Sequence, residues 1–180
     1  MRLSLLSLFL SFALFAKGEP TQVIGYLPHY RAGAIDALPY ELLTDLIFFS
    51  VEPRVDGSID SSDAKPTTLR KLTTLAKAER VKVHLCVGGW GKSKGFSKMA
   101  ADPAARLGFV RNLTAFLKKH ELNGADVDWE HPRSKAEIEN FQKLLFELKK
   151  TFDLHGFELD LNLKDDWLFF GPHAWNFESP

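Results

Sequence analysis

The chain has 180 residues, of which 45% are hydrophobic, with 23 basic and 23 acidic side chains. This composition is too apolar for a disordered chain, and the balanced charge is not that of a nucleic-acid-binding protein or a polybasic membrane protein. The length indicates one globular domain, or at most a small pair. We therefore expect a folded chain with its own core and no nucleic-acid partner.

The first 18 residues have the pattern of a secretory signal peptide. Arg2 supplies a basic start, residues 3–15 are apolar except for serines, and the small residues Ala16 and Gly18 follow. The apolar run is shorter than the roughly 20 residues that span a bilayer, although a retained membrane anchor is the alternative. We predict cleavage near residue 18, a secreted, extracellular protein, and no membrane attachment after cleavage.

Short β-rich runs alternate with helical stretches along the rest of the chain. We predict strands at residues 23–27, 45–51, 81–87, 124–128 and 157–163. Strands that are nearly continuously apolar and separated by helices are typical of a parallel sheet, so the predicted fold class is α/β. A complete (β/α)8 barrel takes about 250 residues. The chain therefore has room for about five βα units of eight, which is a partial TIM barrel.

Three longer helices are predicted between these strands. The first begins at Pro66, the second at Pro103, and the third after the capping pair Ser134 and Glu137. Their apolar positions recur at helical spacing: Leu69, Leu72 and Leu75; Leu107, Val110, Leu113 and Leu117; Ile138, Phe141, Leu145, Leu148 and Phe152. Each helix therefore has one apolar face that can cover the sheet.

Acidic side chains alternate along the fourth predicted strand and its end, at Asp126, Asp128 and Glu130. Successive strand residues point to opposite faces, so these three share one face, about 6 to 7 Å apart. Carboxyl groups on a buried face are costly through desolvation and repulsion, which indicates a functional site; a solvated polar face is the alternative. Such a row can perform general acid–base catalysis. Glu130, at the carboxyl end of the strand, is the best candidate for the proton donor.

The segment Asp126-Val-Asp-Trp-Glu resembles the D-x-x-D-x-D-x-E signature of glycoside hydrolase family 18, the chitinases and their relatives. Residues 86–90, Cys-Val-Gly-Gly-Trp, resemble the S-x-G-G motif of that family, and residues 24–26 resemble its opening strand. The resemblance runs from about residue 23 to about residue 152. It implies a (β/α)8 barrel that hydrolyses polymers of β-1,4-linked N-acetylglucosamine.

The resemblance also implies a substrate-assisted mechanism. Glu130 would protonate the glycosidic oxygen and later act as a base. Asp128 would orient the acetamido group of the substrate, and Asp126 would share a proton with Asp128. The acetamido oxygen of the substrate would attack the anomeric carbon, so no nucleophile from the protein is required.

The predicted substrate-binding residues lie at the ends of the first and third strands. Gly88 and Gly89 belong to the glycine motif, and Tyr26 and Trp90 can stack on sugar rings, with core packing as an equal alternative. The expected partner is chitin or an N-acetylglucosamine oligosaccharide, and no protein partner is indicated. No cofactor is expected, and the glycine run does not have the G-x-x-x-x-G-K-[ST] pattern of a phosphate loop.

No metal site is predicted from the sequence. His29, His84 and His131 do not have metal-binding spacing, and His84 lies within a strand, where a structural role is expected. A site made of Asp126, Asp128 and His131 is a weaker alternative, because the spacing of residues along a strand separates these side chains.

The chain departs from the family pattern at Asn123, which replaces the first aspartate of the signature, and at Cys86, which replaces the serine of the glycine motif. Both stand beside the row of acids, so we expect modest effects on the chemistry. Cys86 is the single cysteine, which excludes an intrachain disulfide, and its apolar neighbours predict burial. The M-x-Y-D segment and the final-strand tryptophan of the family have no match.

We therefore divide the chain into a signal peptide at 1–18, a partial family 18 catalytic domain at 19–163 and a divergent aromatic tail at 164–180. A truncated product with weak or no activity is expected; a tail that caps a half barrel is the alternative. A catalytically silent carbohydrate-binding relative and a non-functional fragment are the other interpretations. Silent relatives commonly lose the acid that this chain keeps as Glu130.

Overall fold

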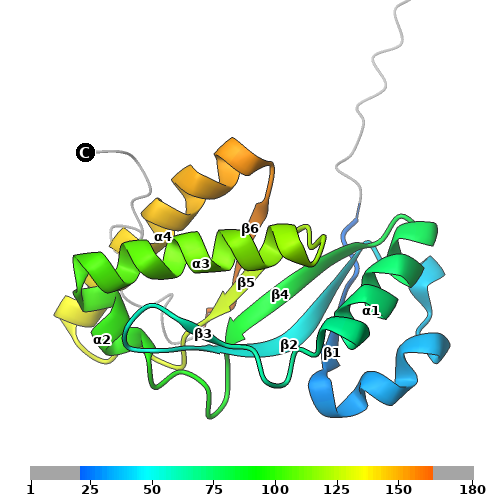
Figure 1. Cartoon of the computed structure of the whole chain (residues 1–180), viewed down its shortest axis with the longest axis horizontal. Coiled ribbons are helices and arrows are strands. Elements are labelled where there is room, and N and C mark those ends of the chain that lie inside the picture. The colour runs from blue at the N-terminus through cyan, green and yellow to red at the C-terminus, as the bar shows by residue number, and fades with distance from the viewer. Residues whose placement is uncertain (1–20, 164–180) are drawn as a thin grey trace, which may run out of the picture.

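Parallel strands in chain order form the centre of the fold (Figure 1). The computed structural model describes residues 21–163, so the predictions for residues 1–18 and 164–180 lie outside the described residues. The sheet has the order β1-β2-β4-β5-β6, and each neighbouring pair is parallel. These strands are β1 (Ile24–Pro28), β2 (Asp45–Pro53), β4 (Lys82–Gly88), β5 (Gly124–Asp128) and β6 (Glu158–Leu161). The predicted α/β fold with a parallel sheet is confirmed.

The predicted helices are α1 (Pro66–Ala78), α3 (Pro103–Lys119) and α4 (Lys135–His155). Local contacts fix where the last two begin. The side chain of Asp102 accepts hydrogen bonds from the first backbone N–H groups of α3, and that of Ser134 accepts one from the N–H of Glu137. Gly156, with a φ of +69°, ends α4. Among the helices of residues 21–163, none is both long and apolar enough to cross a bilayer.

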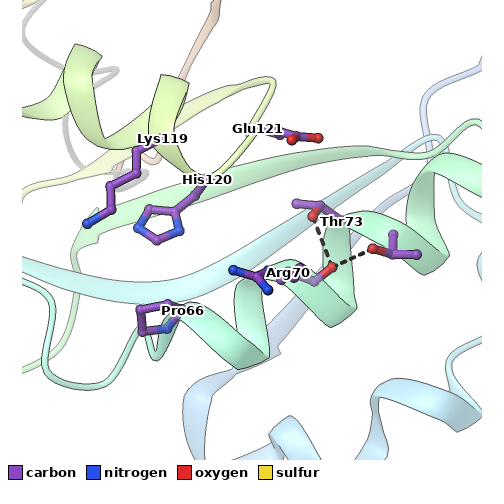
Figure 2. Close-up of a pocket in the computed structure, with 7 residues that line it drawn as sticks. Pro66, Arg70, Thr73, Lys119, His120 and Glu121 are labelled. Atoms are coloured by element: carbon purple, nitrogen blue, oxygen red, sulfur yellow. Dashed lines mark hydrogen bonds between the residues drawn. The ribbon is translucent and has the colours of Figure 1, made fainter.

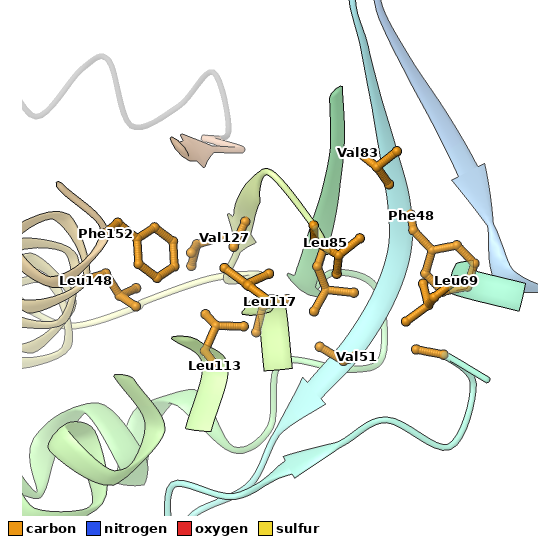
Figure 3. Close-up of a cluster of buried hydrophobic side chains, with 14 of the residues drawn as sticks. Phe48, Val51, Leu69, Val83, Leu85, Leu113, Leu117, Val127, Leu148 and Phe152 are labelled. Carbon is orange, nitrogen blue, oxygen red and sulfur yellow. The ribbon is translucent and has the colours of Figure 1, made fainter. Parts of the chain in front are cut away.

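The core lies between these helices and one face of the sheet, as Figure 3 shows. Strand residues of this face and helix residues form one buried cluster, which includes Phe48, Val83, Leu85, Val127, Leu69, Leu113, Leu117, Leu148 and Phe152. The predicted helical stripes therefore supply most of the helix side of the core.

One predicted core position is wrong. Leu107 is 52% exposed, and its neighbour Arg106 is buried instead. The guanidinium of Arg106 donates hydrogen bonds to Glu147 Oε1 at 2.8 and 2.9 Å and to the carbonyl of Ala100 at 2.8 Å. A buried charge needs such partners. The pairing with Glu147 on α4 therefore places Arg106, rather than Leu107, on the inner side of α3.

Several short elements were not predicted. They are the 3-10 helices η1 (His29–Ala37) and η2 (Tyr40–Leu42), the strand β3 (Ile59–Asp60), which pairs antiparallel with β2, and the helix α2 (Phe96–Ala101). Each is too short or too irregular to show a hydrophobic period. Of these, α2 matters most for function, because its first residue packs beneath the row of acids.

Candidate active site

The acids of β5 lie on the face of the sheet opposite to the helices. Asp126 and Asp128 are buried, at 1% and 5% exposure, while the ring of Trp129 points to the helix side. That ring stacks on Phe96 of α2 at 5.2 Å between centroids and meets Phe141 of α4 edge-on at 5.3 Å. This aromatic packing fixes Trp129 on the helix side of the sheet. Because side chains alternate along a strand, the carboxyl groups of Asp126 and Asp128 share the other face.

Asp126 is held by a side chain from the far edge of the sheet. The hydroxyl of Tyr26, on β1, donates a hydrogen bond to Asp126 Oδ2 at 3.1 Å. The thiol of Cys86 also bonds to Asp126 from β4. Burial raises the pKa of Asp126, and the two donors only partly offset this. Burial together with Asp126 likewise raises the pKa of Tyr26 and of Cys86, so both stay protonated donors.

Asp128 has the most informative electrostatics of the row. Burial, then the nearby charges of Glu130 and Asp126, raise its pKa to about 7. The amide of Asn162 lies 3.4 Å from Asp128 Oδ2 and is a weak donor at that distance. At neutral pH the row therefore holds a proton at or near Asp128, as closely spaced carboxyl groups do.

Glu130 follows the end of β5 and is half-buried. Its backbone N–H donates to the hydroxyl of Ser93 at 3.0 Å, and that hydroxyl lies 3.2 Å from the carbonyls of Gly89 and Asp128. Ser93 thus ties the glycine loop to the backbone that presents Glu130. Sequence reasoning missed Ser93, because a serine in a loop carries no periodic or motif signal.

The predicted glycines Gly88 and Gly89 let the loop after β4 approach the end of β5. Their φ values are +99° and +85°, which favour glycine. The N–H of Gly89 donates to the carbonyl of Asp128 at 2.7 Å. These glycines therefore position the acids through the backbone, and their contact with substrate stays a prediction.

We expect Gly88→Ala to lower the free energy of unfolding by about 3 kcal/mol or more. An added Cβ would lie 2.2 Å from the carbonyl oxygen of Asp128, in a backbone conformation that is already unfavourable for alanine. Gly91→Ala is the matched control, since Gly91 also has a positive φ, of +77°, but no atom within 4 Å of its Cβ position. Urea unfolding measures both variants. Equal losses would contradict the close approach at Gly88.

The two predicted sugar-stacking residues are exposed to different degrees. The indole of Trp90 is 86% exposed, and Tyr26 is 49% exposed although its hydroxyl reaches Asp126. The alternative that Trp90 is a core aromatic is therefore wrong. Stacking of either ring on a sugar stays a prediction.

A separate cavity of about 390 Å³ lies between α1 and the turn after α3 (Figure 2). It is lined by Pro66, Arg70, Thr73, Thr74, Lys119, His120 and Glu121. The threonine hydroxyls donate to the carbonyl of Arg70 rather than into the cavity. Its lining includes none of the predicted site residues, so the row of acids is the better candidate for catalysis.

Comparison with known proteins gives the same assignment along most of the chain. The model of glycosyl hydrolases family 18 matches residues 22–167. Probable chitinase 2 of Drosophila melanogaster is 37% identical over 92 residues, which are 48% of this chain and 19% of that protein. An endochitinase of Manduca sexta is 31% identical over 140 residues, which are 71% of this chain and 25% of that protein.

A solved structure resembles the fold as well. The Ostrinia furnacalis Group IV chitinase, determined in complex with allosamidin, superposes with a TM-score of 0.71 at 28% identity. The match covers 78% of this chain and 42% of that structure, so the chain spans less than half the length of this relative. The open parallel sheet thus corresponds to part of a TIM barrel, as predicted.

Proposed function

Because the chain belongs to glycosyl hydrolases family 18, we propose that it hydrolyses polymers of β-1,4-linked N-acetylglucosamine such as chitin. The proposal rests on one observation: the carboxyl groups of Asp126 and Asp128 share one face of β5, Glu130 follows the end of that strand, and burial together with the charges of Glu130 and Asp126 raises the pKa of Asp128 to about 7. A carboxyl group with such a pKa, next to Glu130, can take up and release a proton at neutral pH.

The proposed mechanism assigns a separate role to each acid. Glu130, the least buried of the three, protonates the glycosidic oxygen while the acetamido oxygen of the substrate attacks the anomeric carbon and the bond to the leaving sugar breaks. A water molecule then opens the cyclic intermediate, and Glu130 takes up the proton that this water releases. Asp128 orients the acetamido group, and Asp126 shares a proton with Asp128.

Other groups support binding in this proposal. Trp90 and Tyr26 offer exposed aromatic surface beside the acids, and aromatic rings suit the apolar faces of sugars. The glycine loop, fixed by Gly89 to the carbonyl of Asp128, keeps the acids in place. We further propose that the catalytic unit begins after residue 18 and that the protein acts outside the cell, since the signal-like segment at 1–18 directs export.

The function is tested by comparing two tetrasaccharides with the same β-1,4 linkage, one of N-acetylglucosamine and one of glucosamine. We expect any cleavage, including weak cleavage, to occur only in the acetylated one, because the acetamido oxygen is the nucleophile. Mass spectrometry of the products measures cleavage, and calorimetry measures binding. Binding without cleavage would assign the chain to the silent carbohydrate-binding class, and cleavage of both sugars would contradict the substrate-assisted mechanism.

A further inference from the structure

A second polar cluster lies at the opposite end of the strands from the catalytic acids, on the same face of the sheet. It contains His84 of β4, Asp45 of β2 and Glu158 of β6. In the register of the sheet, His84 pairs with Gly124 and Gly124 pairs with Glu158. Because glycine has no side chain, the imidazole and the carboxylate can meet across β5.

The distances from His84 to the two carboxyl groups are those of metal ligands. His84 Nε2 lies 3.4 Å from Asp45 Oδ1 and 3.6 Å from Glu158 Oε2, and the three atoms lie within 4.8 Å of one another. Tetrahedral zinc, with bonds of about 2.0–2.2 Å, separates its ligand atoms by about 3.3–3.6 Å. His84 is 1% exposed, and its Nε2 and Asp45 Oδ1 are buried without a hydrogen-bond partner within residues 21–163.

The remaining polar atoms of the three residues are already engaged. His84 Nδ1 lies 2.5 Å from Asp160 Oδ2, Asp45 Oδ2 accepts from the hydroxyl of Thr44 at 2.6 Å, and Glu158 Oε1 accepts from Lys82 at 2.5 Å. A histidine that donates Nδ1–H to a carboxylate presents the lone pair of Nε2 to the site. Hydrogen bonds of this kind, made by the other polar atoms of the ligand side chains, orient the ligands of bound metals.

We propose that His84, Asp45 and Glu158 bind a divalent transition-metal ion of the zinc type, with water as the fourth ligand. An imidazole nitrogen favours zinc over calcium or magnesium, which prefer oxygen ligands. The side chain of Glu158 is 44% exposed, so an ion can enter beside β6. Bound metal links β2, β4 and β6, and this role replaces the purely structural one expected for His84.

Titration of the full, chelator-treated protein with zinc chloride, followed by calorimetry, tests the site. We expect one ion to bind per chain. His84→Gln and Glu158→Gln should each weaken zinc binding by at least about tenfold, and Asp160→Asn by about 10- to 100-fold through the orientation of His84. Glu158→Gln changes a half-exposed residue at the edge of the described sheet, so it remains informative if His84→Gln does not fold.

Two controls separate this site from other ligands of the chain. Cys86→Ser tests the single thiol, and His155→Gln tests an exposed histidine at the end of α4; both should leave the affinity within about twofold. Cobalt supplies an independent readout, since a site without thiolate gives tetrahedral absorption bands without sulfur charge transfer. No saturable binding, or a zinc affinity in both His84→Gln and Glu158→Gln equal to that of the wild type, would overturn the proposal and leave His84 as an ion-pair partner of the surrounding acids.

Discussion

Glu130→Gln should lower the rate of hydrolysis of N-acetylglucosamine oligomers by about 10²- to 10⁴-fold and leave their affinity nearly unchanged. The amide has the shape of the acid but cannot deliver the proton that the departing sugar requires. The backbone N–H of Glu130, which donates to Ser93 Oγ at 3.0 Å, is retained in the variant, so the local backbone is preserved. A fluorogenic disaccharide measures the rate, and calorimetry with a tetrasaccharide measures the affinity.

The matched control for this variant is Glu139→Gln. Glu139 lies on the exposed side of α4, and its contact with Lys135, at 3.9 Å, is too long and too exposed to matter for stability. We expect wild-type rate and affinity from it. If Glu130→Gln kept more than about a tenth of the wild-type rate, another group would have to supply the proton and the proposed role of Glu130 would be wrong.

The two variants together distinguish catalysis from binding. A chain that binds oligosaccharides equally well with Glu130 or Gln, and hydrolyses them in neither form, is a carbohydrate-binding relative. A chain that loses both properties in Glu130→Gln has a misfolded loop, which far-ultraviolet and near-ultraviolet circular dichroism would detect. Only a selective loss of rate supports the acid role.

Local periodicity was sufficient to predict the main elements of this fold. The strand at residues 124–128 and the helix after Ser134 follow from alternation, apolar spacing and capping, all of which involve neighbours in sequence. The orientation of Asp126 and Asp128 to one face of the strand, and of Trp129 to the other, likewise follows without tertiary information. The structure adds the reason why this orientation is kept, which is the packing of Trp129 on Phe96 and Phe141.

Contacts between distant segments could not be predicted in this way. The Tyr26 to Asp126 hydrogen bond joins residues 100 positions apart, and Ser93 reaches Glu130 from a loop. The cluster around His84 depends on the register of four strands and on the missing side chain of Gly124. A single sequence carries no local signal for such a register.

Asp128→Asn should stop hydrolysis and, at the same time, stabilise the folded chain at alkaline pH. In the folded state the carboxyl group of Asp128 has a pKa of about 7, because burial and the charges of Glu130 and Asp126 disfavour ionisation; its ordinary value is 3.8. Between these two pH values the folded state binds more protons than the unfolded state does. The free energy of unfolding of the wild type therefore falls as the pH rises from about 4 to about 7.

The side chain at position 128 cannot ionise in Asp128→Asn, so this variant does not lose that stability as the pH rises. The pKa difference corresponds to at most about 4 kcal/mol, at 1.36 kcal/mol per pKa unit, so we expect Asp128→Asn to be more stable than the wild type by about 2 to 4 kcal/mol at pH 8. At pH 4 the wild-type carboxyl group is protonated and the two chains should differ by less than about 1 kcal/mol. Urea unfolding at the two pH values measures both differences.

Asp153→Asn, at an exposed carboxylate of α4 that pairs only with Lys149 among the described residues, is the control and should change stability by less than about 0.5 kcal/mol at either pH. Equal stability of Asp128→Asn and wild type at pH 8 would mean that Asp128 does not carry the proton of the row. The same buried charge that destabilises the fold above pH 7 is the one that the proposed reaction uses to hold the acetamido group. A variant that gains stability only at alkaline pH, while losing turnover, therefore shows that the sheet keeps Asp128 for chemistry and not for folding.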